Sequence, residues 1–174
     1  YFGSAACSPP QDGSFREYVQ VTAENCHLIP DSMNYRQAAM LEPLSIAVHG
    51  IGQAGSIAGK RVLVTGAGPI GQLIGLVARH YGAANLAVSD IRQDALDLAA
   101  SLWADQPVRA DQPDTVAQAA GEGFDIVVEA SGAPTALQNA YEHCKAKGTI
   151  VQLGVQGGPV ELPVNLVMQK ELTI

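Results

Sequence analysis

Short apolar runs alternate with helical patterns from Lys60 to the end of the chain. Four runs are rich in β-branched residues and have little polar alternation, which is typical of strands buried on both faces of a parallel sheet. Between the runs, apolar residues recur at helical spacing, as Leu73, Ile74, Val77 and Tyr81 do. The pattern therefore predicts alternating strands and helices, with strands over residues 61–66, 85–90, 124–131 and 148–155.

Two weaker segments extend this series. Residues 107–111 have the composition of a short strand, and another strand is predicted to begin within residues 171–174. Strands that alternate with helices pack as a doubly wound α/β fold, and their crossovers are right-handed. The sequence therefore predicts a mostly parallel, six-stranded Rossmann sheet.

The first 41 residues lack this alternation. Residues 14–21 have the pattern of a single strand, and a helix is predicted to begin near Met33 or Asn34. One strand alone cannot make a sheet. We therefore interpret residues 1–41 as the end of a preceding domain and residues 42–174 as the Rossmann domain, cut within its last strand. The chain is expected to be a piece of a longer protein, because it begins without Met and ends in an apolar run.

Composition narrows the class of ligand. Hydrophobic residues make up 47% of the chain, which is enough for a packed core, and the net charge is -7. Nucleic acid and anionic membranes need a cationic surface, so neither is expected as a partner. The three cysteines are widely spaced and form no disulfide ladder or CxxC pair, which favours a reducing, cytoplasmic location. A small-molecule ligand is the remaining expectation.

The segment "VLVTGAGPIGQLIG" carries a GxGxxG motif directly after a predicted strand. Gly66 permits the tight turn, Gly68 lets the backbone approach a pyrophosphate, and Gly71 allows close packing of helix on strand. The N-terminus of that helix supplies free N–H groups and partial positive charge for phosphates. Pro69 and Ile70 complete the turn. By itself the motif is equally compatible with an ordinary glycine-rich turn.

Asp90 ends the next predicted strand, 19 residues after Gly71. The dinucleotide fingerprint places an acid at this distance, where it accepts from the adenosine ribose hydroxyls. Strand, glycines, helix and acid together predict dinucleotide binding, with NAD preferred because a carboxylate repels a ribose phosphate. Arg92 leaves NADP as an alternative, since a guanidinium can hold that phosphate; otherwise Arg92 is a solvated residue at a helix start. Ile91 lies between them.

Further cofactor contacts are expected where other strands end. Ligands of open α/β sheets bind at the carboxyl ends of the strands. Two groups of residues stand at such ends, and each is otherwise interpreted as a plain loop. The expected lining residues are Ala130 and Ser131 after one strand, and Leu153, Gly154 and Val155 after another.

Glu42 is the only charged residue between Arg36 and Lys60. If its apolar segment packs into a core, the carboxylate needs a basic partner, a metal ion or a proton. Alternatively, it lies on the solvent-exposed side of a helix N-terminus, where a negative charge interacts favourably with the helix dipole. The local pattern allows both interpretations.

The segments "LEPLSIAVHG", "DGSFREYV" and "KEL", together with the glycine fingerprint, resemble the medium-chain, zinc-dependent alcohol and polyol dehydrogenases. The similarity extends over essentially the whole chain and is strongest to the sorbitol and L-idonate 5-dehydrogenase branch. It implies hydride transfer between a secondary alcohol of a polyol or sugar acid and NAD(P), with L-idonate favoured. In that family the glutamate of "EPLS" lies at the catalytic zinc and the substrate.

The resemblance therefore implies a metal and substrate role for Glu42, and a place for Phe2 in the pocket wall. It also implies that residues 1–41 are the C-terminal end of the family's GroES-like catalytic domain. The family's other zinc ligands precede Tyr1, so zinc is expected in the full-length, homo-oligomeric enzyme and not in this chain. Many relatives also have Arg five residues after the ribose-binding acid, where this chain has Ala95.

Two other functions stay open from the sequence. One is a non-catalytic nucleotide-binding module, and the other is a zinc-free NADPH quinone reductase. Glu42 argues against both, and Asp90 argues against the NADPH enzyme in particular.

Overall fold

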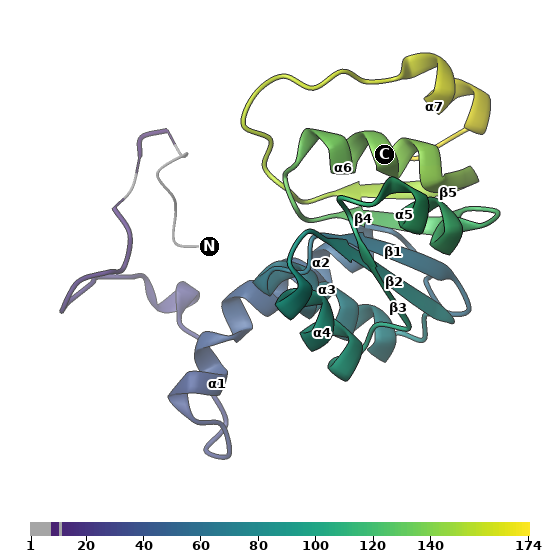
Figure 1. Cartoon of the computed structure of the whole chain (residues 1–174). Coiled ribbons are helices and arrows are strands. Elements are labelled where there is room, and N and C mark those ends of the chain that lie inside the picture. The colour runs from purple at the N-terminus through teal and green to yellow at the C-terminus, as the bar shows by residue number, and fades with distance from the viewer. Residues whose placement is uncertain (1–7, 11) are drawn as a thin grey trace. The chain divides into compact units, whose positions relative to one another are not determined.

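The computed structural model describes residues 8–10 and 12–174 (Figure 1), so Phe2 lies outside the described part. The chain forms two compact units that divide after Ala39. In the first unit, the structure has a 3-10 helix, η1 (Ala23–Asn25), and helix α1 (Tyr35–Ala39). The strand predicted over residues 14–21 is wrong, because this segment has no β pairing in the described residues.

Helix α1 begins close to the predicted position because its start is locally capped. The Asn34 side-chain oxygen accepts a hydrogen bond from the Gln37 N–H at 3.0 Å, and the Gln37 side-chain oxygen accepts one from the Asn34 N–H at 3.0 Å. This reciprocal arrangement satisfies two donors that a helix start leaves unpaired. The assignment of residues 1–41 to a catalytic domain stays a prediction.

The second unit is a doubly wound α/β fold, as predicted. Its sheet has five parallel strands in the order β3-β2-β1-β4-β5. The predicted sixth strand is represented by a single parallel bridge between Thr149 and Thr173. The strands are β1 (Arg61–Thr65), β2 (Asn85–Asp90), β3 (Gln106–Arg109), β4 (Phe124–Glu129) and β5 (Cys144–Gln152).

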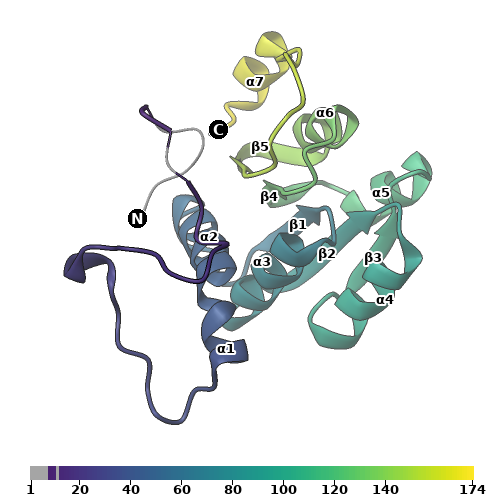
Figure 2. The same cartoon turned by 90° about the vertical axis from the view of Figure 1, so that its left-hand side faces the viewer.

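Helices cover both faces of this sheet (Figures 1 and 2). On one face, Ile51 of α2, Ile74 of α3 and Leu96 of α4 share a core with Val62 of β1. The next strand residue, Leu63, faces the opposite core, which includes residues of α5 and α6 and is packed by α7. The helices are α2 (Leu41–Gln53), α3 (Pro69–His80), α4 (Gln93–Leu102), α5 (Pro113–Ala120), α6 (Pro134–His143) and α7 (Val164–Lys170).

Burial on both faces explains why the strands read as continuous apolar runs. Val62, Leu63 and Val64 are all fully buried, although their side chains alternate between the two cores. Tyr81 is an exception to the predicted helical face: it caps the C-terminus of α3 and is 46% exposed. No helix in the described part of the chain is long and apolar enough to cross a membrane.

Candidate dinucleotide site

The turn between β1 and α3 needs two of its three glycines for its own geometry. Gly66 has a φ of +92°, and a Cβ there would lie 2.9 Å from the Ser131 Cα. A Cβ on Gly71 would lie 1.8 Å from the carbonyl oxygen of Gly66. Any larger residue at either position would therefore force the backbone of the turn apart.

Gly68 differs from Gly66 and Gly71, because neither its backbone angle nor a contact with the described residues requires a glycine there. Its φ of -67° is open to any residue, and no atom of the described residues lies within 4 Å of a Cβ added to it. It is the N-cap of α3, offers no side-chain cap, and is followed by Pro69 at the first helical turn. The open space therefore lies at an uncapped helix N-terminus, where free N–H groups and the helix dipole favour an anion.

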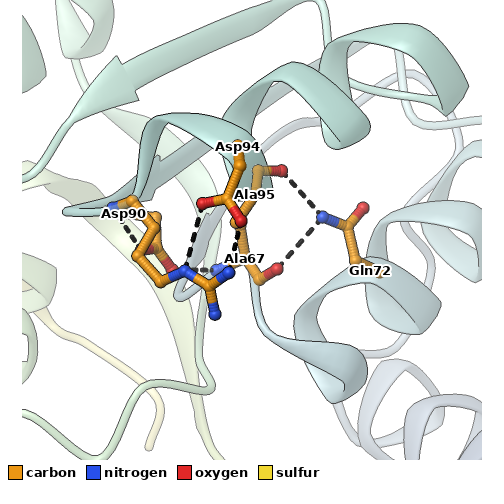
Figure 3. Close-up of polar contacts among 6 residues, drawn as sticks. Ala67, Gln72, Asp90, Asp94 and Ala95 are labelled. Atoms are coloured by element: carbon orange, nitrogen blue, oxygen red, sulfur yellow. Dashed lines mark hydrogen bonds and ion pairs between the residues drawn. The ribbon is translucent and has the colours of Figure 1, made fainter.

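Asp90 is the last residue of β2 and holds the glycine turn in place (Figure 3). One carboxylate oxygen accepts a hydrogen bond from the Ala67 N–H at 2.6 Å, and the other accepts one from the Arg92 N–H at 2.8 Å. The side chain is only partly buried. Its oxygens therefore have acceptor capacity left for a ligand beside the turn.

Gln72 of α3 is a second support of this turn, and the sequence analysis missed it. Its amide nitrogen donates to the carbonyl oxygens of Ala67 at 3.0 Å and Ala95 at 2.9 Å (Figure 3). Its amide oxygen accepts from the Trp103 indole N–H at 2.8 Å. The buried amide thus links α3, the glycine turn and α4. The signal in the sequence was one polar residue on the apolar face of a predicted helix.

Arg92 lies on the rim of the same region, next to the exposed Ile91. Its guanidinium forms a two-point ion pair with Asp94, and the two side chains are 68% and 69% exposed. The hydrogen bond between them raises the pKa of Arg92 and lowers the pKa of Asp94. Asp94 therefore competes with any phosphate for this guanidinium, and the NADP alternative stays open.

The predicted lining residues after β4 and β5 are brought together at one edge of the sheet. The Leu153 and Gly154 N–H groups donate to the Glu129 carbonyl oxygen at 2.8 and 2.9 Å. Ser131 is exposed, Ala130 is half-buried, and Val155 is 90% exposed. These positions place polar backbone and small side chains beside the glycine turn, as a cofactor wall requires.

Glu129 itself is fully buried at this edge and was not identified from the sequence. Its carboxylate accepts hydrogen bonds from the Ser131 N–H at 2.8 Å and the Ser131 hydroxyl at 2.5 Å. The available signal was an acidic residue closing the apolar run of β4, in the segment "VVEAS".

Glu42 does not have the buried surroundings considered for it. It lies in the first turn of α2 and is exposed, while the Ser45 hydroxyl donates to its backbone carbonyl oxygen at 2.6 Å. The local geometry is that of an acid at a helix start. Among the residues that the structure describes, no group of three or more His, Cys, Asp or Glu is placed to hold a metal ion. The metal role of Glu42 stays a prediction.

Cys144 is not a reactive residue of this site. It is buried at the start of β5, and burial raises the pKa of its thiol to about 11. The thiol is therefore protonated at neutral pH and behaves as a small apolar side chain.

Comparison with known proteins agrees with this geometry. The profile of the family described as zinc-binding dehydrogenase matches residues 69–174. L-idonate 5-dehydrogenase (NAD(P)(+)) of Escherichia coli K12 is 35% identical over 100% of this chain and 51% of its own length. D-xylulose reductase of Saccharomyces cerevisiae is 35% identical over 97% of this chain and 49% of its own length.

Solved structures give the same result. The crystal structure of the Escherichia coli L-idonate enzyme matches 99% of this chain and 50% of its own with a TM-score of 0.90 and 35% identity. A short chain alcohol dehydrogenase of Escherichia coli CFT073 complexed with NADH matches 94% of this chain and 49% of its own, with a TM-score of 0.87 and 31% identity. The chain spans about half the length of the curated relatives it matches.

Proposed function

The chain belongs to the zinc-binding dehydrogenase family, and from that premise we propose that it is the dinucleotide-binding part of a polyol dehydrogenase. The reaction is reversible oxidation of a secondary alcohol in a polyol or sugar acid, with L-idonate as the favoured substrate and NAD as the favoured cofactor. The observation that carries the proposal is Gly68: the chain itself gives no reason for a glycine there, whereas a pyrophosphate at the start of α3 does.

Different residues of the site bind different parts of the cofactor. The N-terminus of α3 binds the pyrophosphate, and Asp90 accepts from the adenosine ribose hydroxyls. Because the strand order is β3-β2-β1-β4-β5, the two halves of a dinucleotide extend in opposite directions from β1. The nicotinamide then lies over the ends of β4 and β5, near Ser131 and Gly154. When bound, the nicotinamide ring supplies the hydride acceptor.

The family's zinc is a separate matter. A catalytic zinc site uses three protein ligands, and the described residues offer Glu42 without two companions. This chain therefore does not fit zinc alone, and we assign the remaining ligands to the longer protein.

The test is a titration of the purified chain with NAD, NADP and NADH, followed by an activity assay. NAD should bind at least about tenfold more tightly than NADP, because Asp90 repels the extra phosphate. With L-idonate or sorbitol, and with or without zinc, the chain should form no NADH, since no metal-bound alcohol is placed beside the nicotinamide.

Three results would contradict parts of this proposal. Equal affinities for NAD and NADP would remove the ribose role of Asp90. A preference for NADPH would favour the quinone reductase. Polyol-dependent reduction of NAD by the chain would show that its catalytic groups lie within these residues.

A further inference from the structure

Glu129 is the only buried acidic or basic residue in the described part of the chain, with 0% of its surface exposed. A buried carboxylate is normally paired with a cation, because leaving water is costly for a charge. Here no Lys or Arg among the described residues contacts it. Its partners are hydrogen-bond donors of neutral groups.

These donors come from three neighbouring strand ends. One carboxylate oxygen accepts from the Ser131 N–H and hydroxyl, the Gly132 N–H at 3.0 Å and the Thr65 hydroxyl at 3.3 Å. The other accepts from the side-chain amide of Gln152 at 2.9 Å and, at 3.5 Å, from that of Gln156. A single carboxylate thus joins the ends of β1, β4 and β5.

The surrounding glycines show how closely the loops approach this carboxylate. A Cβ on Gly154 would lie 2.3 Å from the Glu129 Oε2 atom and 2.3 Å from the Gly132 nitrogen. Gly132 has a φ of +70°, and a Cβ there would lie 2.6 Å from the Val155 carbonyl oxygen. The loops after β4 and β5 therefore pack directly on Glu129 and on each other.

The same cluster reaches the phosphate turn. A Cβ on Gly66 would lie 2.9 Å from the Ser131 Cα, so the turn and the loop after β4 are in contact. The Gln152 amide also donates to the Gly154 carbonyl oxygen at 2.6 Å, which ties the β5 loop to the residue that holds Glu129. The position of each loop thus depends on the carboxylate's acceptor geometry.

We propose that Glu129 is the positioning residue of the nicotinamide half of the site. It does not touch the cofactor, because it has no exposed surface. It fixes the loop 131–132 directly, and the loop 153–156 through the amides of Gln152 and Gln156. The adenosine half is held independently by Asp90 at the end of β2. The inference rests on the proposed dinucleotide function.

The test is Glu129→Gln in the purified 174-residue chain. The substituted side chain keeps one oxygen that can accept from Ser131 and Gly132. Its NH2 group, however, faces the NH2 group of Gln152, so two donors meet and that hydrogen bond is lost. NADH should bind about tenfold more weakly, whereas ADP-ribose, which lacks the nicotinamide, should bind within about twofold of the unmodified chain. The shift in bound NADH fluorescence should also decrease.

Two further variants make the experiment specific. Glu122→Gln is the matched control, because it removes the same charge from an exposed residue before β4, at the opposite end of that strand. It should leave both affinities unchanged. Gln152→Ala removes the amide that donates to the Glu129 carboxylate. Because Gln152 is exposed, this variant tests the proposal even if Glu129→Gln fails to fold. Gln152→Ala should also lower the affinity for NADH more than the affinity for ADP-ribose.

The outcomes separate the two proposals. If the unmodified chain binds neither NADH nor ADP-ribose, the dinucleotide function is overturned. If it binds both, but the Glu129 and Gln152 variants keep the NADH to ADP-ribose affinity ratio unchanged, or lose both ligands together, only the positioning role is overturned.

Discussion

Asp90 and Glu129 are both carboxylates at the carboxyl end of a parallel strand, and both accept hydrogen bonds from backbone N–H groups of a neighbouring loop. They differ in burial. Asp90 is partly exposed and has two backbone donors, whereas Glu129 is fully buried and is shared by three strand ends. Both carboxylates lie at the carboxyl ends of strands in one sheet. The carboxylate of Asp90 is therefore accessible to a ligand, whereas that of Glu129 makes hydrogen bonds only within the protein.

The glycines of the two regions show the same division. Around Gly68 no atom lies within 4 Å of an added Cβ, while around Gly154 the nearest atoms lie at 2.3 Å. The region around Gly68, which we propose binds the adenosine and the phosphates, keeps open space beside the glycine turn. The region around Gly154, proposed to bind the nicotinamide, is in contrast built by backbones that pack on each other, so its shape depends on internal hydrogen bonds.

The largest expected difference is in stability. Glu129→Ala removes the shared acceptor of the Thr65, Ser131 and Gly132 donors and should lower the free energy of unfolding by at least about 3 kcal/mol. Asp90→Ala leaves the Ala67 N–H unpaired and should lower it by about 1 kcal/mol. Urea unfolding of the two variants measures both values. Equal losses would mean that burial does not distinguish the two carboxylates.

Gly68→Ala should separate binding from stability. The added methyl group meets no atom of the described residues but would occupy the space proposed for the pyrophosphate. NADH affinity should therefore fall by about tenfold, while the unfolding free energy changes by less than about 0.5 kcal/mol. Gly52→Ala is the matched control, because its Cβ also meets no atom within 4 Å. Its NADH affinity should be unchanged. Normal NADH binding by Gly68→Ala would place the pyrophosphate elsewhere.

The smallest expected effect concerns the adenosine rim. Asp94→Asn weakens the exposed pair with Arg92 and frees the guanidinium, so NADP affinity should rise by about threefold. Asp97→Asn on the same helix, whose carboxylate is bonded to Gln93, is the control and should leave NADP affinity as it is.

The pH dependence sharpens this prediction. Because Arg92 lowers the pKa of Asp94, the pair is intact at and above the usual aspartate range, near about 4, and is lost only as pH falls through the lowered pKa. The difference between Asp94→Asn and the unmodified chain should therefore persist from neutral pH to about pH 5. Competition titrations with NADP at both values test this, and a difference that vanishes by pH 5 would contradict the pairing.

Local signals were sufficient for the strands and the glycine turn. A strand that is buried on both faces must be apolar along its whole length, so β1, β2 and β4 were visible in the sequence. The strand predicted over residues 148–155 is instead β5 (Cys144–Gln152). Its first half contains the exposed residues Lys145 and Lys147, so no apolar run indicated where it begins. Gly66 is favoured by its positive φ in the turn, and Gly71 by its close approach to the Gly66 carbonyl oxygen within the same turn. The predicted strand over residues 14–21 failed for the opposite reason, since a strand exists only with a partner and the local pattern cannot supply one.

What the sequence determined by itself was the alternating α/β order, the phosphate turn and the acid at the end of β2, because each is specified by neighbours along the chain. Burial of a carboxylate was decided only by the tertiary structure. Glu42 stands in an apolar segment and is exposed, while Glu129 closes the apolar run of β4 and is fully buried. The physical reason is that Ser131 and Gly132, which follow Glu129 closely in sequence, supply only some of its donors. The Thr65 hydroxyl and the Gln152 amide come from other strands, and only the parallel sheet brings them to the same carboxylate.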